Sequence, residues 1–182
     1  SIGGGRGIYA SQIFLDYFFE RGNSADTILY FIDPWVFYSA KWNEENDLFS
    51  DEPLRHDFLR FIIRKGVNFS TIANYIKLKI SWSWVRQNPA YKDEETGSLD
   101  SADPEAVQKR IASLYPDGLS GSNFEKYKKM LYDLAQTAVA NHMRLILIIP
   151  ATLLGDLPGE NELKKTMDDL RETYGTESYD LS

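Results

Sequence analysis

The chain has 182 residues, a net charge of −7, 43% hydrophobic residues and no cysteine. The hydrophobic content excludes a disordered chain, and the missing cysteine excludes a disulfide framework, a thiolate metal site and a cysteine nucleophile. No apolar run approaches the roughly 20 residues of a membrane helix. Only two histidines are present, so a zinc site would need carboxylates as well. We therefore expect no metal site and no cofactor.

The first part of the chain predicts a glycine loop, a helix and a buried strand. Glycines dominate residues 1–7, and residues 8–21 place apolar side chains on one face at helical spacing. Residues 28–32 form a short continuous apolar run, closed by Asp33 and Pro34. Such a run is typical of a strand that is buried on both faces of a parallel sheet.

Helices dominate the middle of the chain. Residues 53–64, with Pro53 in the first turn, and residues 70–86 each show an apolar stripe at helical spacing. A polar connection then leads to a short helix that we expect to begin at Asp103–Pro104. We interpret residues 50–115 as a helical insertion within the domain.

The last third of the chain returns to an alternation of helix and strand. Four elements are predicted in chain order: a helix over 122–142, a strand over 145–149, a helix over 160–174 and a short strand over 178–181. Ser122 and Glu125 form a capping-box pattern for the first of them. The alternation predicts an α/β fold, in which right-handed crossovers place helices on both faces of a parallel sheet.

Candidate site residues follow from this arrangement, because sites in such sheets lie at the carboxyl ends of the strands. Asp33 follows the first strand and can orient a histidine or bind a hydroxyl group; the alternative is a turn or cap before Pro34. The backbone N–H groups of Gly3, Gly4 and Gly5 can hold an anion or an oxyanion. The alternative for these glycines is a tight turn, and they match no phosphate-binding fingerprint.

One stretch of the chain differs sharply in charge from the rest. Residues 58–92 contain seven Lys or Arg and no Asp or Glu, which leaves −14 for the remainder. Cations next to aromatic rings are typical of a membrane-surface element, a glycan-binding face or a nucleic-acid patch. Nucleic acid is the least favoured, because the whole chain is acidic. Four residues are candidates for a binding face: Trp35, Trp82, Trp84 and Arg86. The alternative is a helical hairpin whose aromatic side chains pack on the domain.

Several runs of residues carry a resemblance to a known family. They are Ser-Ile-Gly-Gly-Gly-Arg-Gly-Ile-Tyr-Ala-Ser-Gln, an aromatic helix, Ile-Leu-Tyr-Phe-Ile-Asp-Pro-Trp, the later Leu-Ile-Leu-Ile-Ile-Pro and the final Tyr-Asp-Leu-Ser. Together they resemble the interior of SGNH/GDSL-like hydrolases. The likeness is closest to the branch related to membrane-associated and cell-envelope polysaccharide-modifying proteins. It covers most of the chain in order, through short and degenerate motifs.

The resemblance implies a three-layer α/β/α sandwich with a flavodoxin-like parallel sheet. It also implies a serine nucleophile after the first strand, a glycine and an asparagine in the oxyanion hole, and a late Asp-x-x-His base. Only the glycine step has a match, in Gly3–Gly5, and the asparagine is absent near Asp33. The nucleophile strand would precede Ser1 and the Asp-x-x-His would follow Ser182. We therefore expect residues 1–182 to form a single domain that is incomplete at both ends and inactive alone, since acyl transfer needs all these groups together.

The resemblance further implies an esterase or O-acetyltransferase that acts on cell-envelope glycans. The expected partner is then a glycan or an acylated small molecule, and the expected location is extracytoplasmic. An alternative is a non-catalytic glycan-binding or membrane-surface-binding module that uses residues 58–92. A third interpretation is an interaction domain, in which the helices of that segment dock a protein partner.

Overall fold

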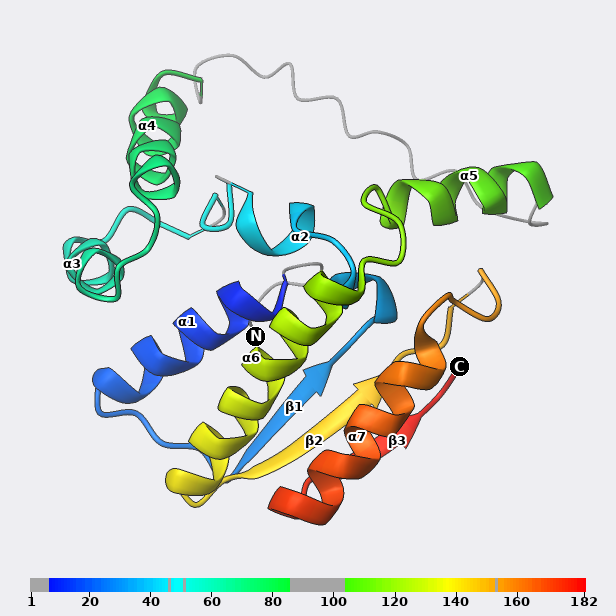
Figure 1. Ribbon diagram of the computed structural model, residues 1–182. Helices are drawn as coiled ribbons and strands as arrows, with labels where there is room; N and C mark the ends of the chain where they lie inside the picture. The colour runs from blue at the N-terminus through cyan, green and yellow to red at the C-terminus, as the bar shows by residue number, and fades with distance from the viewer. Residues whose placement is uncertain (1–6, 46, 51, 86–103, 153) are drawn as a thin grey trace. The chain divides into compact units, whose positions relative to one another are not determined.

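The computed structural model describes residues 7–45, 47–50, 52–85, 104–152 and 154–182, with the backbone alone for 80–85 (Figure 1). The chain divides into two compact units. One combines Ser1–Asn43 with Ala102–Ser182, and the other is Glu44–Ser101. Among the helices that the structure describes, none combines the length and the hydropathy that a bilayer crossing requires.

Three parallel strands form the sheet of the first unit. In spatial order they are β1 (Thr27–Phe31), β2 (Arg144–Ile149) and β3 (Glu177–Asp180). Ile28 lies opposite Leu145 on β2, and Ile148 of β2 lies opposite Tyr179 on β3. All three predicted strands are confirmed, each within one residue at its ends.

Helices connect and accompany these strands in the first unit. They are α1 (Ile8–Glu20), the 3-10 helix η1 (Pro34–Phe37), α2 (Lys41–Glu44), α5 (Pro104–Leu114), α6 (Gly121–Ala140) and α7 (Glu160–Tyr174). The capping box predicted at Ser122 is wrong, because Ser122 is already helical. The N-cap is Ser120, whose backbone is extended and whose Oγ accepts a hydrogen bond from the N–H of Asn123 at 3.4 Å.

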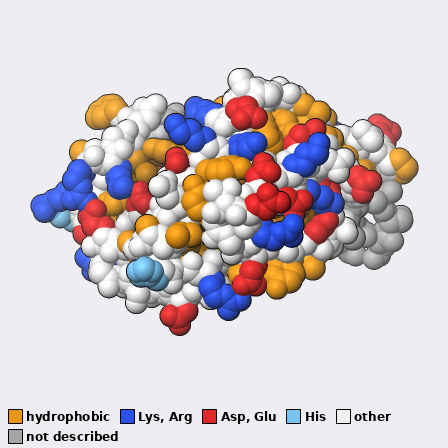
Figure 2. Space-filling view, turned by 60° about the horizontal axis from the view of Figure 1, so that its bottom comes forward, with side chains coloured by type: hydrophobic (Ala, Val, Ile, Leu, Met, Phe, Trp, Pro, Cys, Tyr) orange, Lys and Arg blue, Asp and Glu red, His pale blue; other side chains and the backbone are white. Residues whose placement is uncertain are grey.

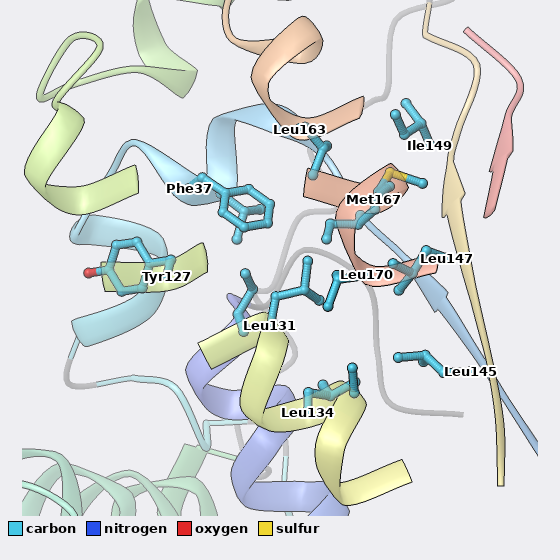
Figure 3. Close-up of a cluster of buried hydrophobic side chains, with 14 of the residues drawn as sticks. Phe37, Tyr127, Leu131, Leu134, Leu145, Leu147, Ile149, Leu163, Met167 and Leu170 are labelled. Carbon is cyan, nitrogen blue, oxygen red and sulfur yellow. The ribbon is translucent and has the colours of Figure 1, made fainter. Parts of the chain in front are cut away.

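Helices α6 and α7 pack against one face of the sheet, and α1 packs against α6. Figure 3 shows Leu145, Leu147 and Ile149 of β2 on the same side as the apolar residues of α6 and α7. These three strand residues are buried, as are Leu134 of α6 and Leu170 of α7. The hydrophobic core of the unit therefore lies between this face and the helices.

The opposite face of the same sheet is apolar and open. Because side chains alternate along a strand, Leu29 and Phe31 of β1 and Tyr179 of β3 project away from the core. Phe31 is 60% exposed, and no helix in the described part of this unit covers it. The described unit is thus a mixed α/β fold with a small parallel sheet, and the third layer of the predicted sandwich stays a prediction.

The outer edge of β1 is also open. The N–H of Ile32 donates to the carbonyl of Ile148 at 2.9 Å, so the even-numbered residues of this strand bond to β2. The alternation of a parallel ladder therefore turns the backbone N–H and C=O groups of Thr27, Leu29 and Phe31 outward. No strand in the described residues pairs with this edge.

The second unit is a helical pair, α3 (His56–Arg64) and α4 (Phe69–Val85), with an aromatic core of its own. The Phe58 ring lies 5.4 Å from Phe49 and 5.8 Å from Tyr75, edge-on to both. The Tyr75 hydroxyl donates to the carbonyl of Pro53 at 2.6 Å and accepts from the N–H of Arg55 at 3.2 Å. This contact keeps Pro53 outside the helix, so the predicted helix start at residue 53 is wrong and α3 begins at His56.

Candidate functional site

The carboxyl ends of the three strands lie together at one end of the sheet in the first unit. Asp33 follows β1, Pro150 follows β2, and Leu181 and Ser182 follow β3. Parallel strands place their carboxyl ends together, which is where α/β sheets bind ligands. The carboxyl end of the sheet is therefore the candidate functional site, and its polar groups are carboxylates and hydroxyls.

Asp33 lies directly after the first strand, as predicted. Its backbone is extended and begins η1, but its side chain makes no capping hydrogen bond. Asp33 is the N-cap residue of η1, and its backbone carbonyl accepts from the N–H of Val36 at 3.2 Å, so the alternative of a turn or cap before Pro34 is confirmed for the backbone. The carboxyl group is partly buried, and this burial raises its pKa.

Tyr30 precedes Asp33 on the helix-facing side of β1. Burial raises the pKa of Tyr30 to about 12; a hydrogen bond with Ser11 opposes this shift, and the negative charge of Asp33 adds to it. The Ser11 hydroxyl also donates to the carbonyl of Gly7 at 3.2 Å. Tyr30 is therefore protonated at neutral pH, so its hydroxyl cannot act as a base.

Two further tyrosines extend this arrangement. The rings of Tyr38 and Tyr115 lie 6.0 Å apart, and the Tyr115 hydroxyl donates to the carbonyl of Pro158 at 2.6 Å. Burial raises the pKa of Tyr115, and the negative charges of Asp33 and Glu160 raise it further. The buried Tyr115 hydroxyl therefore keeps its proton at neutral pH.

An ion cluster ties the start of α7 to the end of β3. Lys164 Nζ lies 2.5 Å from Glu160 Oε1 and 2.6 Å from Asp180 Oδ2. The hydrogen bond from Lys164 lowers the pKa of Glu160, and it lowers that of Asp180 to about 2. The Ser182 hydroxyl lies 2.6 Å from Asp180 Oδ1 and 3.0 Å from Glu160 Oε1. Both carboxylates are ionised at neutral pH, so this cluster is a clamp between the two elements.

Trp35, a predicted binding-face residue, is partly buried in the first unit. Its ring meets that of Trp42 edge-on, with centroids 5.0 Å apart. The Trp42 indole N–H donates to the carbonyl of Leu114 at 3.0 Å, and Lys41 Nζ lies 4.9 Å above the Trp42 ring. Trp35 therefore contributes to packing as well as to the surface.

The start of α1 depends on a residue that sequence reasoning missed. Asn43 is fully buried, and its side-chain N–H groups donate to the carbonyls of Val36 at 2.7 Å and Ser39 at 3.2 Å. Its Oδ1 accepts from the N–H of Tyr9 at 3.4 Å, and the N–H of Gly7 donates to the carbonyl of Trp42 at 3.0 Å. An asparagine among charged neighbours is typical of a surface loop, so the sequence carries no signal for this role.

Several predicted site residues lie outside the described residues. Gly3, Gly4, Gly5 and Arg86 are among them, so the oxyanion-hole and binding roles assigned to them stay predictions. Trp82 and Trp84 belong to α4, but the description of that stretch stops at the backbone. The proposed aromatic binding face therefore stays a prediction too.

The two histidines belong to different units of the chain. His56 is the first residue of α3 in the second unit. His142 is exposed in the left-handed region (φ 56°) just before β2, at the opposite end of the sheet from the candidate site. Among the described residues, no group of His, Asp and Glu is arranged to hold a metal ion.

The carboxyl end of the sheet can bind a ligand through carboxylate and hydroxyl groups, which suits a hydroxyl-rich ligand. A nucleophile paired with a histidine is not found in the described part of this end. No protein-family model, no curated protein and no solved structure matches the chain.

Proposed function

We propose that residues 1–182 are the central part of an SGNH/GDSL-like hydrolase domain with a three-layer α/β/α sandwich in its complete form. The complete protein is then an esterase or O-acetyltransferase that acts on cell-envelope glycans. Two observations together carry the proposal: Asp33 follows the end of β1 in a parallel sheet, and the outer edge of that same strand is open in the described residues.

The open edge supports the proposal because of where a further strand would end. A parallel strand that pairs with the outward N–H and C=O groups of Leu29 and Phe31 has its carboxyl end next to Asp33. A nucleophile that follows such a strand therefore lies at the candidate site. The resemblance implies a nucleophile strand of this kind.

The open face supports the third layer. Leu29 and Phe31 project from it with more than half of their surface exposed. Burial of apolar surface contributes about 25 cal/mol per Å², so a helix layer on this face would stabilise the fold. The three-layer sandwich is therefore the form in which this sheet is protected on both faces.

The polar groups of the site support a binding role within that domain. The partly buried carboxyl of Asp33 has a raised pKa, and Tyr30 and Tyr115 keep their protons at neutral pH. Carboxylate and hydroxyl groups suit the recognition of sugar hydroxyls. The nucleophile and its base are expected from segments outside residues 1–182, since acyl transfer needs both together with the oxyanion donors.

The test is acetate release from 4-nitrophenyl acetate and from an acetylated glycan. The full-length gene product should hydrolyse both substrates. Its variant in which the nucleophile serine expected before residue 1 is changed to alanine should lose the activity. Residues 1–182 alone should be inactive. Asp33→Asn in the full-length protein should raise KM for the glycan, with Asp26→Asn, an exposed carboxylate just before β1 at the opposite end of the sheet, as the matched control. Hydrolysis by residues 1–182 alone, or full activity without that serine, would contradict the proposal.

A further inference from the structure

The turn between α3 and α4 exposes two large apolar side chains. Phe69, the first residue of α4, is 81% exposed, which is the highest value among the large hydrophobic residues described. Ile63, next to the last residue of α3, is 56% exposed. Exposed apolar groups that sit together mark an interaction surface more often than scattered ones do.

Cations surround these two side chains. On α3, Phe58, Phe61 and Ile62 form the buried stripe. At 100° per residue, Arg60, Ile63 and Arg64 therefore lie on the opposite, exposed face. At the left edge of the view, Figure 2 shows Lys and Arg side chains with Asp and Glu side chains beside them.

The charge at the turn is of one sign. Residues 58–79 contain five Lys or Arg and no Asp or Glu. The cations of Arg64 and Lys65 lie 5.9 Å and 5.7 Å from the ring of Phe61, which is itself buried. The buried ring therefore anchors both side chains next to the turn. Lys79 is not one of the cations beside the Phe61 ring, because its Nζ donates to the carbonyl of Ser50 within the unit.

Acidic groups in this helical pair lie at the other end of α3. Asp57 is in the first turn and pairs with Arg55 at 3.8 Å. Within α3, the carboxylate is therefore in the first turn, and Arg60 and Arg64 lie towards the end that carries Ile63. This combination matches an anionic lipid surface, where cations meet phosphates and apolar groups enter the headgroup region.

We propose that the α3–α4 turn docks on an anionic membrane surface. Phe69 and Ile63 insert at the level of the headgroups, and Arg60, on the exposed face of α3, meets lipid phosphates. The partner is fixed by charge complementarity: the chain as a whole is acidic, so an anionic surface repels most of it and attracts this turn. The proposal does not depend on the hydrolase activity.

The test is co-sedimentation of the chain with two kinds of vesicle, phosphatidylcholine alone and phosphatidylcholine mixed with phosphatidylglycerol. We expect binding to the mixed vesicles that declines with added salt, and no binding to the neutral ones. Arg60→Gln should weaken partitioning about fivefold. Phe69→Ser should weaken it about tenfold, because its ring no longer enters the interface.

Matched controls come from the first unit. Leu119→Ser removes an apolar side chain that is 59% exposed, against 81% for Phe69, and Lys129→Gln removes an exposed cation of α6. Neither should change vesicle binding. Absence of binding to the mixed vesicles, equal binding to neutral vesicles, or equal losses in Leu119→Ser and Phe69→Ser would overturn the proposal. A partner protein or a glycan would then be the better candidate to bind the α3–α4 turn.

Discussion

Asn43 occupies the space in which a side chain at Gly7 would have to lie. A β-carbon on Gly7 would sit 2.2 Å from Asn43 Oδ1 and 2.4 Å from the carbonyl oxygen of Trp42. Gly7→Ala should therefore lower the free energy of unfolding by about 1–3 kcal/mol, the usual cost of overpacking. Urea denaturation followed by circular dichroism measures this change.

Gly121 is the matched control for that substitution. It is the first residue of α6, and a β-carbon there would meet nothing within 4 Å. Gly121→Ala should leave stability unchanged or raise it by about 0.4–1 kcal/mol, because alanine restricts the unfolded chain. Equal destabilisation by both alanine variants would show that the contact between Gly7 and Asn43 is not the cause.

Asn43→Ala should destabilise the first unit for a different reason. The variant leaves the buried carbonyls of Val36 and Ser39 without their donor. An unsatisfied buried group costs about 1–3 kcal/mol, and we expect a loss in that range by thermal or urea unfolding. Asn141→Ala, which removes an exposed bond to Thr137, should cost about 0.5 kcal/mol; a loss as large as that of Asn43→Ala would contradict the account.

The clamp between α7 and β3 makes stability fall in acid. The pKa of Asp180 is about 2 in the folded chain, below its ordinary value, because Lys164 donates to it. A carboxyl with a lowered folded pKa stabilises the fold above its unfolded pKa of about 4, and this contribution is lost as the pH falls towards 2. The pair is partly exposed, so the effect is at most about 1 kcal/mol.

Lys164→Met isolates this contribution. The variant should be less stable than the parent chain at pH 7, and the difference should shrink as the pH falls from about 4 to 2. Free energies of unfolding measured at several pH values supply the comparison. A difference that stays constant over this range would assign the loss to packing of the lysine stem instead.

The ionised carboxyl of Asp33 should lower the stability of the fold, whereas that of Asp180 raises it. Burial raises the pKa of its carboxyl group, so the ionised form is disfavoured in the folded chain. Asp33→Asn should therefore raise the free energy of unfolding at pH 7 by about 0.5–1 kcal/mol. The gain should disappear as the pH falls below the folded pKa of Asp33, where the parent carboxyl is neutral too. A destabilised Asp33→Asn variant at pH 7 would show that the carboxylate has a structural role.

Local pattern predicted the elements of the fold well. The strands around Ile28 and Leu147 follow from continuous apolar runs, and α7 has the predicted bounds of 160–174, with Gly175 as its left-handed C-cap. Boundaries set by tertiary contacts were missed. The start of α3 is determined by the Tyr75 hydroxyl on Pro53, a contact that crosses 22 residues and leaves no local signal.

The candidate site could be predicted only in part. Asp33 follows from the strand-end rule, whereas the cluster of Glu160, Lys164, Asp180 and Ser182 depends on contacts between α7 and the end of β3. Asn43 was missed for the same reason, since its acceptors and Gly7 come together only in the folded chain. Single-sequence patterns register periodicity and turns, and they do not register such long-range polar contacts.

Hydrogen exchange at the amides of Leu29 and Phe31 tests most directly whether the sheet continues beyond β1. These N–H groups face the open edge in residues 1–182, and those of Ile28 and Tyr30, which face β2, serve as internal controls. The account predicts that the Leu29 and Phe31 amides exchange at least about tenfold more slowly in the full-length gene product than in residues 1–182. Equal exchange in both proteins would contradict it, because no strand would then complete the sheet next to Asp33.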